Sequence, residues 1–210
     1  VFTTQPPSSA AAGATFSAVV QIQDANGNVA TQSTAQVTIG AVSVKAVAGV
    51  ATFQNLSIST AGTYTLTATS SGLANAVSTP IAIVPAAAAQ LVFTTQPSSG
   101  TAGQPITPAP VVSIQDNFGN VVNSTAAVTI GSITVNAVAG VASFPNIVIT
   151  TSGNYTLTAS ASGFTNVTSN QFTITPGSGS TMSFSTQPPA SATAGVSFSA
   201  VVQILDSNGN

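Results

Sequence analysis

The chain has 210 residues, and only four of them are charged: Lys45, Asp24, Asp116 and Asp206. A single basic residue excludes the clustered Lys and Arg needed to bind nucleic acid or an anionic membrane surface, and the absence of Cys excludes disulfides and thiolate metal sites. With 43% hydrophobic residues and little net charge, the chain should fold rather than stay disordered. Its longest apolar stretch, 81–93, is too short to span a bilayer and contains Pro85, so no membrane insertion is expected in this segment.

The first part of the chain predicts short β-strands separated by turns. Apolar and polar residues alternate there with a period of two, which is typical of strands with one buried face. Three sets of alternating residues are predicted to face the core. They are Phe16, Ala18, Val20 and Ile22; Val42, Val44 and Ala46; and Tyr64, Leu66 and Ala68. The predicted strands are 1–4, 15–23, 35–39, 42–47, 50–57, 63–69 and 80–84.

The same pattern then returns along the chain. VFTTQP begins at Val1 and at Val92, and the related SFSTQP begins at Ser183, so the spacing is 91 residues each time. Residues 183–210 align without a gap on 1–28 with 20 of 28 positions identical, which suggests a longer period of 182 built from a pair of modules. We therefore predict module 1 at residues 1–87, module 2 at 88–177 and a partial module 3 at 178–210 that holds only the first strands.

Seven short strands in about 90 residues favour a two-sheet sandwich with Greek-key connections. Each full module has one tyrosine, Tyr64 or Tyr155, which follows a Gly at the start of a late strand. This position suits a tyrosine corner, in which the hydroxyl bonds the nearby backbone while the ring packs inward. The fold class predicted is all-β.

Four segments carry a resemblance to a known family: LVFTTQP, VVSIQDNFGN, TVNAVAGVASF and SGNYTLTASASG. They resemble the immunoglobulin-like repeats of large bacterial surface proteins, and the Asp-x-x-Gly-Asn element is similar to that of invasin/intimin-type domains. The resemblance covers the whole chain. It implies tandem immunoglobulin-like Greek-key β-sandwiches, and it is weak for function because such modules serve as stalks, adhesins and filament subunits alike.

The three carboxylates all open the same short element, DANGN, DNFGN or DSNGN. The main interpretation is a structural turn in which the Asp side chain accepts hydrogen bonds from backbone N–H groups and the Gly takes a left-handed conformation. The residues predicted to form these turns are Asp24, Gly27, Asn28, Asp116, Gly119, Asn120, Asp206, Gly209 and Asn210.

Other chemistry has weaker support in the sequence. A calcium loop is the alternative for Asp24, Asn26 and Asn28, but the downstream Glu is missing and Phe118 stands at the middle position of the second copy. The acids lie too far apart for a carboxylate pair, and no His is present to activate a hydroxyl, so we expect no enzyme, no catalytic residue, no metal and no cofactor. Lys45 could form an isopeptide bond to an Asn, although a solvated lysine fits the alternation better.

The sequence leaves two readings open both for glycosylation of the surface and for ligand binding. Four Asn-x-Ser/Thr sequons, at Asn55, Asn123, Asn154 and Asn166, are no more than the composition yields by chance, and the outward Thr rows could carry O-glycans or be plain strand residues. Phe118 is the one aromatic expected at the surface, as a packing residue at a module junction or as a ligand contact.

A surface so poor in charge favours association and suits a wall, sheath or fibre better than a crowded cytosol. We therefore expect an extracellular segment at a bacterial cell surface that forms a stalk, sheath or fibre. Its expected partners are other copies or further repeats of the same chain, and the segment is read as cut from a longer repetitive polymer. The alternative is a set of adhesin modules that bind a glycan or protein ligand.

Overall fold

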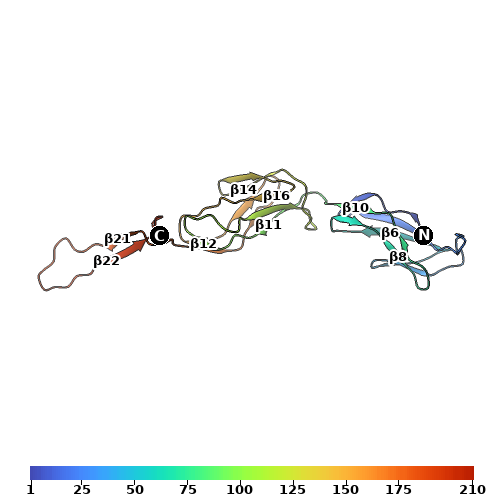
Figure 1. Ribbon diagram of the computed structural model, residues 1–210, viewed down its shortest axis with the longest axis horizontal. Coiled ribbons are helices and arrows are strands. Elements are labelled where there is room, and N and C mark those ends of the chain that lie inside the picture. The colour runs from blue at the N-terminus through green and yellow to red at the C-terminus, as the bar shows by residue number, and fades with distance from the viewer. The chain divides into compact units, whose positions relative to one another are not determined.

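The computed structural model describes all residues, 1–210, and builds them from strands connected by turns and loops (Figure 1). It contains no helix that is long and apolar enough to cross a membrane. The first module contains β1 (Phe2–Thr4), β2 (Ser9–Ala11), β3 (Thr15–Gln21), β4 (Gln36–Ile39), β5 (Val42–Lys45), β6 (Val50–Ser57), β7 (Gly62–Tyr64), β8 (Thr67–Thr69), β9 (Ala76–Val77) and β10 (Ile81–Val84).

The second module repeats this series of strands, and the third contributes two. The series runs β11 (Gln90–Thr95), β12 (Gly100–Thr101), β13 (Val111–Gln115), β14 (Ala127–Ile130), β15 (Ile133–Asn136), β16 (Val141–Ser143), β17 (Gly153–Tyr155), β18 (Thr158–Ser160), β19 (Val167–Thr168) and β20 (Phe172–Thr175). The remaining two strands are β21 (Thr181–Thr186) and β22 (Val201–Leu205), which pair with each other in antiparallel fashion.

One layer of the first sandwich has the strand order β1-β3-β6. Strand β3 alternates strictly, so that Phe16, Ala18 and Val20 are buried while the residues between them are exposed or half-buried. Its partner β6 contributes Ala51 and Phe53, both fully buried. The alternation read from the sequence therefore selects the core face of this layer.

The other layer consists of β2-β10-β7 and β5-β4-β8-β9. The single strand predicted at 63–69 is divided into β7 and β8 at Leu66. There the buried Ser78 Oγ accepts a hydrogen bond from the Leu66 N–H at 2.9 Å and donates to the Thr79 carbonyl at 2.8 Å. A serine hydroxyl thus replaces a strand-to-strand bond, and Ser169 does the same for Leu157 in the second module. The prediction missed this break because alternation continues through it.

The two layers of each module enclose one hydrophobic core, and the two cores have matching residues. The prediction of an all-β, immunoglobulin-like sandwich is confirmed. Of the predicted inward set Val42, Val44 and Ala46, Ala46 is buried and Val44 is half-buried against the core, but the prediction for Val42 was wrong, since Val42 is 40% exposed. Strand β5 pairs only with β4 at the end of its sheet, so its first residues have no neighbour on the other side.

The repeated Thr-Thr-Gln-Pro motif has a structural role in the sandwich. The Gln5 Oε1 atom accepts a hydrogen bond from the Thr79 N–H at 2.9 Å, and the Gln96 Oε1 atom accepts one from the Asn170 N–H at the same distance. In each module this glutamine ties the first strand to the segment that carries the buried serine. The motif therefore fastens the start of a module to its last strands.

The two compact units of the chain do not coincide with the three sequence repeats, and the partial third repeat lies within unit 2. Unit 1 consists of Val1–Ala89 together with Gln115–Val122, and unit 2 consists of Gln90–Ile114 together with Asn123–Asn210. Unit 1 therefore includes a loop that belongs to the second sequence repeat. That loop contains the second Asp-x-x-Gly-Asn element.

Candidate functional site

The Asp-x-x-Gly-Asn element forms the same closed loop in all three repeats. Asp24 Oδ1 accepts hydrogen bonds from the N–H groups of Asn26 and Asn28, each at 2.9 Å. The loop is completed by backbone bonds from Asp24 N to the Asn28 carbonyl and from Gly27 N to the Asp24 carbonyl. Gly27 has a φ of 86°, in the left-handed region that favours glycine. The equivalent Asp-to-backbone bonds, also 2.9 Å, join Asp116 to Phe118 and Asn120, and Asp206 to Asn208 and Asn210.

The three loops differ in the hydrogen-bond partners of the other carboxylate oxygen of the Asp, Oδ2. In unit 1, Asp116 Oδ2 accepts a hydrogen bond from the Ala86 N–H at 2.9 Å. In unit 2, Asp206 Oδ2 accepts one from the Gly177 N–H at 2.7 Å. Asp24 accepts hydrogen bonds only from its own loop. Two of the three acids thus bind a segment that lies about thirty residues earlier in the chain.

The asparagine that ends each element makes the next contact. Asn120 Oδ1 accepts from the Ala61 N–H and Asn120 Nδ2 donates to the Ser59 carbonyl, both at 2.8 Å and both within unit 1. An amide side chain has the donor and acceptor of a peptide group, so here it pairs with the backbone as a neighbouring strand would. The same pair of bonds, 2.7 and 2.8 Å, joins Asn210 to Ser152 and Thr150 in unit 2. We call each of these Asp–Asn pairs, Asp116 with Asn120 and Asp206 with Asn210, a clasp.

An aromatic contact accompanies the first clasp. Phe118, the middle residue of the loop, lies so close to Gly13 that a Cβ at Gly13 would overlap its ring. Phe118 is nevertheless 51% exposed, so it covers part of unit 1 and shows its other side to solvent. Gly103 has the equivalent relation to Asn208 in unit 2. Both glycines have a positive φ, so two separate constraints favour glycine there.

The two carboxylates that take part in a clasp are buried, and the third is not. Asp116 is fully buried and Asp206 is 3% exposed, whereas Asp24 is exposed. Burial is the largest influence on the pKa of Asp116 and acts to raise it, but the hydrogen bonds from Asn120, Ala86 and Phe118 outweigh burial and hold the pKa below its ordinary value. Each buried carboxylate is therefore kept ionised by the N–H donors around it.

The pKa values of Asp206 and Asp24 are lowered too. For Asp206, burial is again the largest single influence and acts upward, yet the bonds from Asn210, Gly177 and Asn208 lower the pKa to about 2. For Asp24, the Asn28 side chain is the main cause of a lowered pKa, followed by the backbone of its own loop. All three acids are thus anions at neutral pH.

The Asp and Asn side chains of these loops bind backbone groups. No group of three His, Cys, Asp or Glu side chains comes together anywhere in the described chain. The Asp24 carboxylate is occupied by hydrogen-bond donors, since it accepts the backbone N–H groups of Asn26 and Asn28 and the Asn28 side-chain amide. Lys45 is exposed, at the edge strand β5.

The two tyrosines lie in equivalent places at the ends of β7 and β17. Tyr155 donates a hydrogen bond from its hydroxyl to the Thr151 carbonyl at 2.9 Å, and its ring lies 6.3 Å from that of Phe172. Tyr64 is half-buried and packs against the core of its module. Sequence reasoning missed the residues that receive the clasps, because Ser59, Ala61, Thr150 and Ser152 contribute only backbone groups. The one available signal was the asparagine that returns after each Gly.

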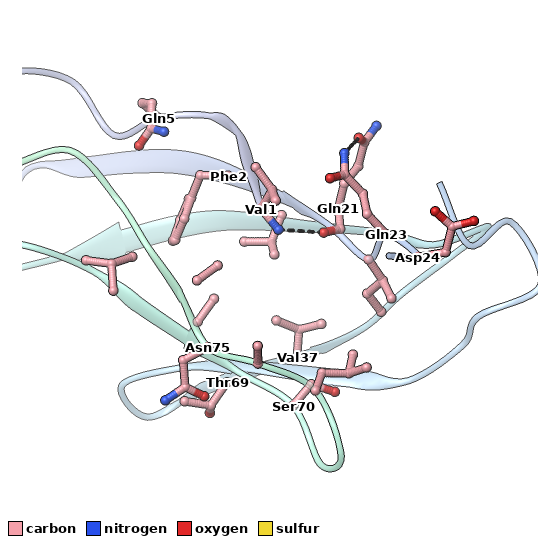
Figure 2. A pocket seen from close by; sticks show the side chains of 17 residues that line it. Val1, Phe2, Gln5, Gln21, Gln23, Asp24, Val37, Thr69, Ser70 and Asn75 are labelled. Carbon is pink, nitrogen blue, oxygen red and sulfur yellow. Dashed lines mark hydrogen bonds between the residues drawn. The ribbon is translucent and has the colours of Figure 1, made fainter. Parts of the chain in front are cut away.

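A hollow of about 410 Å³ lies at the end of the first module beside the Asp24 loop (Figure 2). Core residues such as Phe2 and Val37 line its inner part, and Gln21, Gln23 and Asn75 lie around its rim. Thr69 and Ser70 lie on the same side as Asn75, opposite Gln21 and Gln23. The core residues beside the hollow stay buried, with Phe2 6% and Val37 2% exposed.

No protein-family model and no curated protein matches the chain. Among solved structures, it is similar to InvD of Yersinia pseudotuberculosis, at 20% identity over 97% of this chain and 69% of InvD, with a TM-score of 0.42. It is similar to the D0-D1 domain of intimin at 17% identity over 83% of this chain and 97% of the other, with a TM-score of 0.33. A glycosyl hydrolase family 2 member from Bacteroides cellulosilyticus matches at 9% identity over 78% of this chain and only 23% of the enzyme, with a TM-score of 0.38. Structures of invasin and intimin type are therefore among those that resemble this chain, but TM-scores below 0.5 do not decide a function.

Proposed function

We propose that this chain is a structural segment of an extracellular protein at a bacterial surface, in which repeated sandwiches are joined into a stalk, sheath or fibre. The observation that carries the proposal is the clasp. Two of the three carboxylates in the chain, Asp116 and Asp206, bind the backbone of the linker residues Ala86 and Gly177 and hold a loop of one repeat in the compact unit that precedes it. Two of the four charged side chains of the chain thus bind its linkers.

The composition supports the same proposal. Hydroxyls and amides replace charges over the surface, and a chain with so little self-repulsion associates readily. The partners proposed are further repeats of the same type, since the contact that each clasp makes is to backbone groups and does not depend on the side chains opposite. An extracellular location follows from this function and is part of the proposal.

Electron microscopy of the purified chain at high concentration tests the fibre. Filaments with a regular axial repeat are expected, because low charge and open sheet edges favour contacts between copies. A chain that stays monomeric without filaments would contradict the fibre and the sheath, and the stalk would then be the remaining form of the proposal. The stalk predicts that the clasps resist force, so pulling on single molecules should require more force for the unaltered chain than for Asn120→Ala.

The second candidate is an adhesin module, and the hollow beside Asp24 is the observation that favours it. Apolar core residues line this hollow together with the polar residues Thr69, Ser70 and Asn75, a combination able to bind a sugar by contact and hydrogen bonds. A glycan and protein binding screen tests this function. Saturable binding that is lost in Asn75→Ala but kept in Asn166→Ala, its counterpart in the second module, would favour the adhesin over the structural segment.

A further inference from the structure

We propose that the middle residue of the Asp-x-x-Gly-Asn loop and the turn that it covers form a matched pair, so that a repeat of one kind is stabilised most by a following repeat of the other kind. The loop residue is Phe118 in unit 1 and Asn208 in unit 2, and the turns are those at Gly13 and Gly103. The inference rests on the proposed function in one respect, namely that repeats are joined in series, and it adds which repeat fits which.

The clasp bonds themselves do not distinguish one repeat from another. Both clasps use an Asp and an Asn, and both bind backbone groups of the unit to which the loop belongs. The turns that the loops cover also have equivalent backbone bonds. Gly13 N donates to the Ile58 carbonyl at 2.9 Å, and Gly103 N donates to the Ile149 carbonyl at the same distance. A preference between repeats must therefore come from the side chains around these shared bonds.

The residue that differs between the two loops lies directly over the turn. A Cβ added to Gly13 would overlap the tip of the Phe118 ring, and one added to Gly103 would lie 2.8 Å from Nδ2 of Asn208. The two loops thus present an aromatic ring and an amide group to the same backbone feature. A ring gains free energy by covering apolar neighbours, whereas it loses free energy when it covers polar groups and leaves them without hydrogen bonds.

The side chains around the turn of unit 1 are apolar. Ala11 and Ala14 stand on either side of Gly13 in the chain, both are exposed, and the Ala14 N–H closes the turn on the Ala11 carbonyl at 3.0 Å. Ala11 pairs with Val84 of β10, and Val84 is 48% exposed. The Phe118 ring is therefore placed at an apolar part of the surface, which an aromatic side chain covers favourably.

The side chains at the equivalent positions of unit 2 are polar. Thr101, Gln104 and Thr175 stand there in place of the two alanines and the valine. The backbone is the same, since Gln104 N donates to the Thr101 carbonyl at 3.1 Å and Thr101 pairs with Thr175 of β20. A phenyl ring placed here would cover hydroxyl and amide groups, which costs free energy unless they find new hydrogen bonds. The amide side chain of Asn208 avoids this cost.

This match accounts for the longer period of the sequence. The loops of the first and third repeats have Asn at the middle position and the loop of the second has Phe, an alternation with a period of 182 residues. The Phe loop of the second repeat covers the apolar turn of the first, and the Asn loop of the third covers the polar turn of the second. Two successive repeats of the same kind would combine a ring with a polar turn, or an amide with an apolar one. The partner that fits each turn is therefore a repeat of the other kind.

A double-mutant comparison in the full 210-residue chain tests the match. One variant is Phe118→Asn, a second has a polar turn, and a third combines both changes. The polar turn is made by Ala11→Thr, Ala14→Gln and Val84→Thr. Calorimetry measures the melting temperature, and hydrogen exchange at the Gly13 amide identifies the transition of unit 1. Phe118→Asn is expected to lower this temperature by roughly 4–8 °C with the original turn and by less than half as much with the polar turn. Equal losses with both turns would overturn the proposal, because the ring would then stabilise unit 1 whatever it covers.

The mirrored changes in unit 2 keep the test decisive if the polar turn of unit 1 prevents folding. Asn208→Phe alone is expected to leave the melting temperature of unit 2 unchanged or lower. In a chain whose second turn is made apolar by Thr101→Ala, Gln104→Ala and Thr175→Val, Asn208→Phe is expected to raise it. A rise with Asn208→Phe alone, or no rise on the apolar turn, would overturn the proposal. Neither result affects the microscopy or the force measurement, so failure of this inference is distinguishable from failure of the proposed function.

Discussion

At the scale of single residues, identical side chains in this protein have different surroundings. Asp24 and Asp116 form the same five-residue loop with the same 2.9 Å bonds, but one is exposed and the other is fully buried. The difference comes from Ala86, Ser59 and Ala61, which supply partners to the second loop only. The effects of mutations should therefore differ between the copies.

The asparagine of the clasp provides the first prediction. Asn120→Ala removes hydrogen bonds to the N–H of the half-buried Ala61 and to the carbonyl of the exposed Ser59, so it should lower the free energy of unfolding of unit 1 by about 0.5–1.5 kcal/mol. The matched control is Asn28→Ala, since Asn28 bonds only within its own loop. Chemical denaturation measures both. A loss as large for Asn28→Ala as for Asn120→Ala would contradict the role of the clasp.

Acid should open the second clasp. The pKa of Asp206 in the folded chain is about 2, below its ordinary value of 3.8, so its contribution to stability is fully present above pH 3.8 and is lost as the pH falls through about 2. The Gly177 amide, which donates to this carboxylate, should report the change by NMR with a midpoint near pH 2. In Asp206→Asn this transition should vanish. A midpoint near 3.8 in the unaltered chain would show that the N–H donors do not hold the anion.

At the scale of elements, the loops between strands decide which segments come together. The turn at Gly13 has a φ of 75° and also touches the Phe118 ring, so its sequence is constrained by a loop more than a hundred residues away. The break between β7 and β8 is another case, in which the Ser78 hydroxyl accepts the Leu66 N–H in place of a strand partner.

Glycine substitutions separate the two constraints on this turn. Gly13→Ala should cost about 1–2 kcal/mol for the left-handed backbone and more for the overlap with Phe118. Gly72→Ala is the control, because Gly72 has a φ of 76° and no atom within 4 Å of an added Cβ. Thermal unfolding should place Gly13→Ala well below Gly72→Ala. In a Phe118→Ala background the two costs should become equal, and a gap that persists there would exclude the ring as the cause.

At the scale of the whole molecule, the stability of unit 1 should depend on a segment outside the first repeat. A fragment of residues 1–89 lacks the loop Gln115–Val122 and with it the clasp of Asp116 and Asn120. Its melting temperature should be lower than that of unit 1 in the full chain, by roughly 4–8 °C for each 1 kcal/mol of clasp energy. Calorimetry on the two proteins makes the comparison, and equal melting temperatures would show that the repeat is stable without its successor.

Most of the fold could be predicted from the sequence, because strands with one buried face reveal themselves in local alternation. Phe16, Ala18, Val20 and Ile22 are buried as their spacing predicts. Val42 was placed wrongly because alternation identifies a face but does not tell whether a neighbouring strand will cover it. The division at Leu66 was missed because the responsible hydroxyl lies twelve residues away.

The sequence by itself determined the class of fold, the period of the repeats and the chemistry of the acidic loops, since all of these depend on local pattern. The tertiary structure decided which of those loops is buried and what it binds. That information lies in hydrogen bonds between residues about thirty and sixty positions apart, and their partners are backbone groups of Ala86, Gly177 and Ala61. Every residue carries such backbone groups, so no residue type in the sequence identifies the ones that bind. Only the folded chain shows which backbone groups donate hydrogen bonds to the Asp carboxylates or pair with the Asn side chains.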